Sequence, residues 1–266
     1  MENTFNLYMR DFTLSSYSKL LDQIRTSAYE FITFQQFCER PDREQKWCIL
    51  RHDVDRLPWN AVKMSNIELE KGIKASYYFR VAKEAYNQNV IKRIVEAGHE
   101  AGYHYEDMDL ASGDKIKAYE LFKTHLEHFR SFYDVKTICM HGSPLSQYDN
   151  RDIWKEYDYK DHGIIGEPYY DLDFNNVFYV TDTGRKWNNS EVSVRDKVKT
   201  PFNIEIQNIQ HFINRLKAGE LPDKIMINTH PNRWFDESYL WVKELVMQNI
   251  KNQIKKVIIK KRKNSS

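Results

Sequence analysis

Apolar runs and helix-like segments alternate along this chain of 266 residues. Short apolar runs with the length of buried strands occupy 47–50, 75–80, 99–104, 137–140, 176–181 and 224–228. Segments whose apolar side chains recur at helical spacing occupy 13–33, 58–72, 89–97, 116–132 and 201–218. Strands that alternate with helices in this way predict an α/β fold, a mostly parallel sheet or barrel with helices outside.

The strand-like runs end in ionisable residues. The first of them ends in Arg51-His52-Asp53-Val54-Asp55, and later ones end at His104, His141, Asp182 and His230. In a parallel barrel these carboxyl ends converge on one face. Two carboxylates beside an imidazole are costly to bury unless a cation or a catalytic task holds them. The pattern therefore predicts a catalytic or metal site, although an Asp-rich turn after a strand is the simpler alternative for 53–55 alone.

The residue types indicate which chemistry such a site can perform. The three cysteines, Cys38, Cys48 and Cys139, form no CxxC pair, so a thiolate zinc site or disulfide scaffold is not expected. Asp and His suit a divalent metal, zinc or a harder ion, held by about three ligands with one position open. A carboxylate that does not bind the metal can accept the proton of a water molecule, and a histidine opposite can protonate a leaving group.

These motifs resemble those of the polysaccharide deacetylase superfamily, carbohydrate esterase family 4 and its relatives. The resemblance extends over about 47–234 and rests on Asp-Val-Asp at 53–55, Gly-His-Glu-Ala-Gly-Tyr-His at 98–104 and Asn-Thr-His at 228–230. It implies a distorted (β/α) barrel of about seven parallel strands. It also implies that Asp53 is the catalytic base, that Asp55 and His104 bind the metal, and that His230 is the general acid.

The chain departs from the family pattern at two places. The family's His-x-x-x-His motif would put a second metal-binding histidine at position 108, where this chain has Met108. His141 is the preferred third ligand because it ends a predicted strand, and Glu106 is the other candidate. The family's Arg-x-Pro-Tyr segment is replaced by His-Gly-Ser-Pro at 141–144. Arg51 or Arg80 could supply the arginine that orients the catalytic aspartate.

The resemblance implies a metal-dependent hydrolase, with zinc the expected metal, that removes an N-acetyl or related acyl group from an amino sugar in a glycan or glycan precursor. Tyr-His-Tyr-Glu at 103–106 and Thr-His-Pro-Asn-Arg-Trp at 229–234 resemble a subgroup of deacetylase-like proteins that are encoded with bacterial surface-glycan biosynthesis. Tyr105, Asp182 and Trp234 are the residues that we expect to contact the sugar. Two alternatives stay open: a catalytically inactive glycan-binding protein on the same scaffold, and a hydrolase of a glycosidic or ester bond. Asp53 and Asp55 do not resemble a carboxylate pair that flanks a glycosidic bond.

Composition and charge limit the partners. The net charge is +2, no groove-reading or phosphate-binding motif occurs, and nucleic acid is not an expected partner. We expect one catalytic domain over 1–266, with a helical N-terminal extension at 1–45 and a basic tail at 251–266. The tail alternates Lys and Arg with Ile and Val, which is typical of a solvated helix end or of a segment that contacts an anionic membrane. No signal peptide or spanning segment is evident, so we expect a cytoplasmic protein, peripheral at the inner membrane face if the tail binds lipid.

Overall fold

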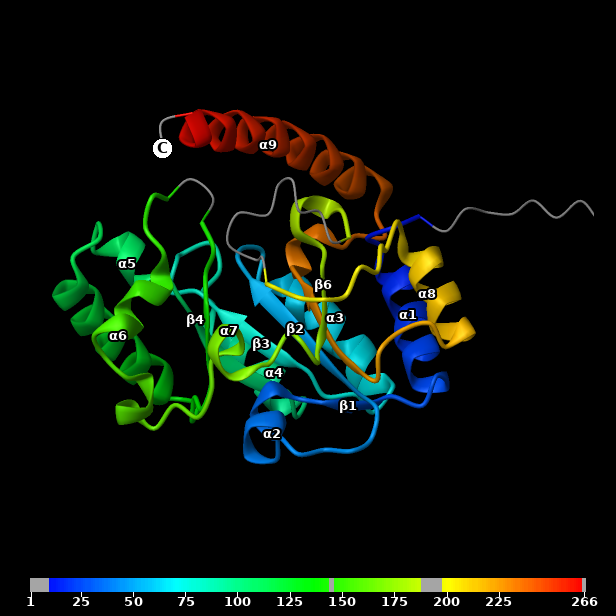
Figure 1. Cartoon of the computed structure of the whole chain (residues 1–266), viewed down its shortest axis with the longest axis horizontal. Helices are drawn as coiled ribbons and strands as arrows, with labels where there is room; N and C mark the ends of the chain where they lie inside the picture. The colour runs from blue at the N-terminus through cyan, green and yellow to red at the C-terminus, as the bar shows by residue number, and fades with distance from the viewer. Residues whose placement is uncertain (1–9, 144–145, 188–197, 265–266) are drawn as a thin grey trace, which may run out of the picture.

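The computed structural model describes residues 10–143, 146–187 and 198–264, with side chains up to 257. It is an α/β fold in which parallel strands form a sheet curled into a half-barrel (Figure 1). Within these ranges six strands follow one path, namely β5 (Ile138–Met140), β4 (Glu100–Tyr105), β3 (Ser76–Phe79), β2 (Trp47–Val54), β7 (Lys224–Thr229) and β6 (Phe178–Thr181). A further short strand, β1 (Glu30–Ile32), pairs with the first half of β2.

The α/β class and the parallel sheet that the sequence predicts are confirmed. The half-barrel path has six strands where about seven were expected in a distorted barrel. The predicted helix over 13–33 is wrong, because α1 (Leu14–Thr26) ends early and the chain continues into β1. Ala28 has a φ of 64°, a left-handed conformation that a helix cannot continue through. Within the predicted N-terminal extension, β1 joins the sheet, whereas α1 and α2 (Phe34–Glu39) are helical. Residues 1–9 lie outside the described ranges.

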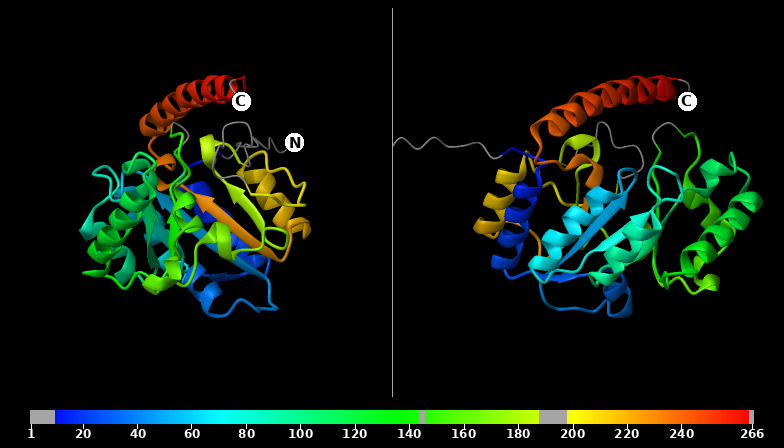
Figure 2. Two further views of the ribbon diagram at one scale, coloured as in Figure 1. Left: turned by 60° about the vertical axis from the view of Figure 1, so that its left-hand side comes forward. Right: turned by 180° about the vertical axis from the view of Figure 1, so that it is seen from behind.

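Helices cover the outer face of the half-barrel (Figure 2). The longer ones are α3 (Trp59–Glu70), α4 (Gln88–Glu96), α6 (Lys115–Arg130) and α8 (Ile209–Ala218). The chain also has three short helices, α2 (Phe34–Glu39), α5 (Asp107–Leu110) and α7 (Pro168–Asp171), and α2 packs through Phe34 and Phe37 in the same cluster as Trp47. The predicted helix over 201–218 starts later, at Ile209, because the Asn208 side chain caps it by accepting from the His211 N–H. A last helix, α9 (Ser238–Asn264), crosses above the carboxyl ends of the strands (Figure 1).

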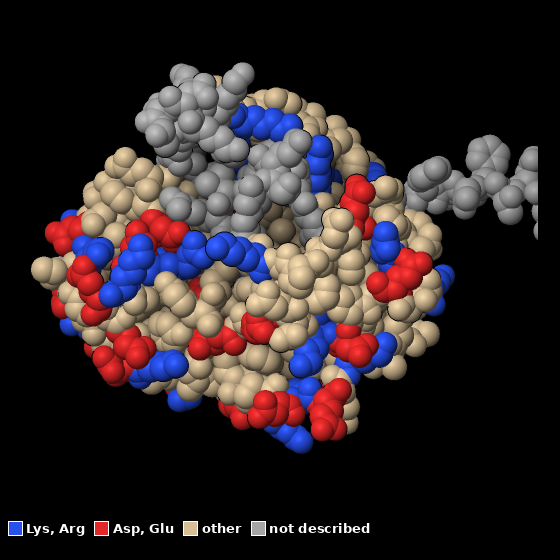
Figure 3. All heavy atoms as spheres, in the orientation of Figure 1, with Lys and Arg blue, Asp and Glu red and all other residues tan. Residues whose placement is uncertain are grey.

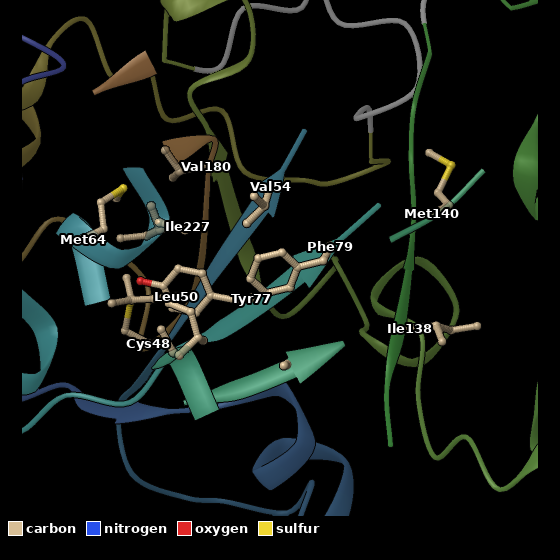
Figure 4. Packing of buried hydrophobic residues seen from close by; sticks show 14 of the residues in the cluster. Cys48, Leu50, Val54, Met64, Tyr77, Phe79, Ile138, Met140, Val180 and Ile227 are labelled. Atoms are coloured by element: carbon tan, nitrogen blue, oxygen red, sulfur yellow. The ribbon is translucent and has the colours of Figure 1, made fainter. Parts of the chain in front are cut away.

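Strand alternation divides the buried residues into two layers. Cys48, Leu50 and Val54 of β2 join Tyr77 and Phe79 of β3 in the layer under the helices (Figure 4). The intervening residues of β2 point to the other face, where Trp47 and Ile49 pack in a second cluster with Tyr78 and Met226. Because side chains alternate with a period of two, Arg51 and Asp53 continue this inner face toward the carboxyl end of the strand. The inner face is therefore apolar at one end and charged at the other.

Candidate functional site

Four of the predicted site residues meet at the carboxyl end of the half-barrel. Asp55 follows β2, His104 lies on β4, and His141 and His230 follow β5 and β7. The Nε2 atoms of His104 and His141 lie 3.6 Å and 3.7 Å from Asp55 Oδ1. His230 Nε2 lies 3.8 Å from Asp55 Oδ2. One carboxylate thus stands among three imidazoles that come from three different strands.

These distances suit ligands arranged around an ion better than hydrogen bonds. They exceed the usual N···O hydrogen-bond length and are equal to or slightly longer than the roughly 3.3–3.6 Å that separates two ligands of one tetrahedral zinc ion. Asp55 Oδ1 is buried and has no hydrogen-bond partner among the described residues. Burial by itself would raise the pKa of Asp55, but the three surrounding imidazoles lower it well below its ordinary range. The carboxylate is ionised and has an oxygen to spare for a cation.

The histidine rings are oriented through their other nitrogen atoms. His104 Nδ1 lies 2.9 Å from the backbone carbonyl oxygen of Cys139. A donor to a carbonyl must carry its proton on Nδ1, which leaves the Nε2 lone pair free to ligate a metal. His141 Nδ1 lies 3.1 Å from Glu106 Oε2, without the alignment of a hydrogen bond. Both rings therefore present Nε2 to the space beside Asp55.

Glu106, the other candidate for the third ligand, is engaged elsewhere. Its Oε2 accepts from Arg80 Nη2 at 2.7 Å and from Arg80 Nε at 3.0 Å, and it faces His141. Burial would raise the pKa of Glu106, but His141 and Arg80 lower it to about 2. A carboxylate behind a metal-binding histidine is a common way to hold the ring and increase its basicity. The geometry favours His141 over Glu106 as the residue that faces the centre.

Asp53 is held by an arginine from its own strand. Arg51 Nε and Nη2 donate to the two carboxylate oxygens at 2.9 Å and 2.6 Å, and Asn228 Nδ2 donates to Oδ2 at 3.0 Å. Burial would raise the pKa of Asp53, but the Arg51 guanidinium, with smaller contributions from His104 and His230, lowers it well below its ordinary range. Of the two arginines considered from the sequence, Arg51 is the one that contacts Asp53, since Arg80 binds Glu106.

His230 is oriented by Asp182. Its Nδ1 lies 2.6 Å from Asp182 Oδ1, and its backbone N–H donates to Asp182 Oδ2 at 3.0 Å. Arg233 Nη1 and Trp234 Nε1 donate to the same carboxylate at 2.5 Å and 2.8 Å. Burial would raise the pKa of Asp182, and Arg233 and His230 lower it below its ordinary value. The imidazole is fixed at one nitrogen, and the other nitrogen faces Asp55.

The expectation that Tyr105, Asp182 and Trp234 contact a sugar needs correction. All three side chains are buried with no exposed surface. Tyr105 alternates with His104 along β4 and therefore points outward, where its ring packs against Phe122 and Trp154. Asp182 and Trp234 belong to the structure that holds His230. These residues support the site from behind and do not line it.

A second set of possible ligands lies deeper. Asp53, His104 and Cys139 are buried, and their ligand atoms lie within 4.8 Å of one another, so this group could hold a metal ion. Cys139 is not among the ligands expected from the sequence. Both oxygens of Asp53 already accept from Arg51, whereas Asp55 Oδ1 has no partner among the described residues. Of the two aspartates, Asp55 therefore has the freer carboxylate oxygen.

On the other face of β2, His52 belongs to a separate buried cluster. Its Nδ1 lies 2.7 Å from Thr229 Oγ1 on β7, and its Nε2 lies 2.9 Å from Glu68 Oε1 on α3. Glu68 also accepts from the hydroxyl groups of Tyr17 and Tyr77 at 2.5 Å and 2.7 Å. His52 points away from Asp53, so it fastens β2 to β7 and to the helix layer and takes no part in the centre.

An open pocket of about 530 Å³ adjoins the centre. Its lining is mostly polar and consists of Arg80, Glu106, Asp109, His141, Ser143, Ser146, Gln147 and Tyr148. His141 is shared between the pocket and the cluster around Asp55. On the face seen in Figure 3, Lys and Arg side chains are interspersed with Asp and Glu.

No protein-family model matches this chain, and no curated protein matches it either. Most of the site residues could be found in the sequence because they are spaced two apart along a strand and its end. Arg51, Asp53 and Asp55 follow this spacing on and just after β2, and Asn228 and His230 follow it at the end of β7. No spacing of this kind in the sequence indicates that Asp182 contacts His230.

Proposed function

We propose that this protein is a metal-dependent hydrolase that removes an N-acetyl or related acyl group from an amino sugar. The observation that supports the proposal most strongly is the Asp55 carboxylate, whose oxygens lie 3.6–3.8 Å from the Nε2 atoms of three histidines. A metal site alone would not need Asp53 and His230. Asp53 lies 3.8 Å from His104 Nε2 and His230 lies 3.8 Å from Asp55, so a base and an acid would both stand beside the proposed ligands.

Asp55, His104 and His141 are the residues that would hold the ion. One carboxylate oxygen and two imidazole nitrogens are a common donor set for catalytic zinc, with a position left open. The fit is supported by the unpartnered oxygen of Asp55 and by the contacts that orient both rings. When bound, zinc would polarise the acyl carbonyl group and lower the pKa of a water molecule.

Asp53 and His230 would move the protons. Arg51 keeps Asp53 ionised, so its carboxylate can accept a proton from the attacking water. An amine is a poor leaving group unless it is protonated, and His230 can protonate it because Asp182 fixes its Nδ1 while Nε2 faces the centre. The two residues come from adjacent strands, β2 and β7, which pair in parallel.

The adjoining pocket suits a sugar. Its lining offers hydroxyl, amide, carboxylate and guanidinium groups, which can exchange hydrogen bonds with the hydroxyl groups of a carbohydrate. It opens beside His141, so a sugar there could present its acyl amide to the centre. A glycan or glycan precursor from a bacterial surface polymer is the substrate class that the sequence motifs suggest.

The test combines metal analysis with product detection. Purified protein should contain about one divalent ion per chain, and it should release acetate from one member of a panel of N-acetylhexosamines, their oligosaccharides and their nucleotide conjugates. His104→Ala should lose both the metal and the activity. His128→Ala is the matched control, since this histidine lies on α6 and contacts Tyr86 at the surface. It should keep both.

Two results would contradict the proposal. A His104→Ala protein with full metal content would exclude the assigned ligands. A metal-loaded wild-type protein that binds a sugar of the panel in calorimetry and never releases acetate would favour the glycan-binding alternative. Release of acetate from O-acetyl sugars alone would instead indicate an esterase, in which the leaving alcohol needs His230 less.

A further inference from the structure

Helix α9 is fastened across the carboxyl end of the half-barrel by polar contacts. Its 27 residues span about 40 Å at the rise of an α-helix. Arg56 Nη2 donates to both oxygens of Glu244 at 2.6 Å and 2.7 Å, and Asn252 Nδ2 donates to the Gly184 carbonyl at 2.8 Å. Arg185 Nη1 donates to the Trp241 carbonyl at 2.8 Å. Figures 1 and 2 show the helix lying along this end of the molecule in every view.

The polarity of α9 is the reverse of that of an ordinary surface helix. Its buried side carries Glu244, Gln248 and Asn252, four residues apart. Its outward side carries apolar side chains that are each at least 50% exposed, namely Tyr239, Val242, Val246, Ile250, Ile254 and Val257. Their spacing of three or four residues places them in one line, which we call the outer stripe. A surface helix that faces only water would normally show the opposite arrangement.

The charges of α9 are almost all positive. Lys243 and Lys256 are exposed, and the sequence continues with further basic residues, Lys260, Lys261, Arg262 and Lys263. Glu244 is the only acidic residue in the sequence from 238 to 266, and it pairs with Arg56. Figure 3 shows Lys and Arg side chains along this helix. A second copy of α9 would bring the same positive charge to the outer stripe, whereas anionic lipid brings the opposite charge.

We propose that α9 docks the protein on an anionic bilayer, with the outer stripe in the interface and the lysines at the lipid phosphates. A helix that is apolar on one side and basic around it is the kind that lies in the plane of a membrane surface. Among the described residues no helix is long and apolar enough to cross a membrane, so the contact is peripheral. The carboxyl end of the half-barrel, which holds the site, faces the side of α9 opposite to the outer stripe. Docking through the stripe would therefore bring the site close to the membrane surface. This inference does not depend on the proposed chemistry.

Vesicle flotation of the full chain tests the inference. The protein should float with vesicles of equal parts phosphatidylcholine and phosphatidylglycerol, should not float with phosphatidylcholine alone, and should be released by salt. Val246→Asp with Ile250→Asp should weaken vesicle binding by at least ~10-fold, because two apolar side chains leave the interface. The matched control is Leu69→Asp with Ile116→Asp, which changes two apolar residues on α3 and α6 that are more exposed than Val246 and Ile250. It should bind as the wild type does.

Two outcomes would overturn the proposal. Equal vesicle binding by both double variants would show that the outer stripe is not the contact. If the wild type does not bind vesicles but sediments as a dimer, and Val246→Asp with Ile250→Asp sediments as a monomer, the stripe covers a second copy instead. Circular dichroism of both variants checks that α9 and the core remain folded, so that neither outcome reflects unfolding.

Discussion

Replacement of Arg51 by Met tests whether the buried ion pair with Asp53 controls both stability and ionisation. The exposed fractions of the two side chains are 0% and 2%, and Arg51 binds both oxygens of Asp53. Removing one partner of a buried ion pair leaves an uncompensated charge and costs about 3–5 kcal/mol of the free energy of unfolding. We expect Arg51→Met to lose this amount near neutral pH, where Asp53 is ionised.

The pH dependence of the loss distinguishes this cause from a packing defect. In the wild type the pKa of Asp53 is below its ordinary value, so its ionisation stabilises the fold above about pH 4 and this contribution disappears as the pH falls. In Arg51→Met, burial raises the pKa of Asp53 above its unfolded value. The folded variant then binds the proton more tightly than the unfolded chain, so its stability decreases as the pH rises. The cost of the substitution should therefore grow between about pH 4 and pH 8.

Urea unfolding of the metal-free protein, in the presence of a chelator, measures these free energies without a contribution from ligand binding. Asp53→Asn removes the charge and keeps the shape, so it completes a double-mutant cycle with Arg51→Met. We expect the double variant to be more stable than Arg51→Met alone at pH 8, by about 2 kcal/mol. A cost that is equal at all pH values, with no recovery in the double variant, would refute the reasoning.

Three further predictions concern neighbouring residues. Burial raises the pKa of Glu167 from 4.5 to about 7. The free energy of unfolding of the wild type should therefore fall by up to about 3 kcal/mol as the pH rises between these two values. Urea unfolding of Glu167→Gln at several pH values should not show this fall. Asp182→Asn should lower kcat by roughly 10²–10⁴-fold with unchanged metal content, and a near-normal kcat would deny it a role in orienting His230. Gly102→Ala should cost about 1–3 kcal/mol, because the added carbon would lie 2.5 Å from the Tyr78 ring and 2.8 Å from the Thr137 carbonyl oxygen; an unchanged unfolding midpoint would contradict this.

The convergence of the site could be predicted from the sequence because it depends on strand geometry. Parallel strands end at one edge, and the period of two puts Arg51, Asp53 and Asp55 on one face of β2. The same two rules bring His104 of β4 and His230 after β7 to that edge. The roles of these residues remain predictions, since distances alone do not demonstrate chemistry.

The orientation of other side chains could not be predicted. A strand-end acid can turn toward the site or away from it, and Asp182 turns toward His230, Arg233 and Trp234. Tyr105 is an exception, because strand alternation beside the inward-pointing His104 sends its side chain outward, away from the sugar contact that was expected. The early end of α1 depends on the left-handed conformation of Ala28, a residue type that ordinarily favours helix.

Strand β2, which carries Asp53, and strand β7, which leads to His230, are fastened to each other on both faces. On the inner face Asn228 of β7 contacts Asp53, and on the outer face His52 contacts Thr229 of β7, while the backbone ladder joins them between. Such a pair resists shear, so the separation of Asp53 and His230 is a fixed dimension of the protein. Adaptation to a larger or smaller substrate would then have to come from the loops around the pocket. Loop exchange would therefore change the pocket and leave the spacing of Asp53 and His230 intact.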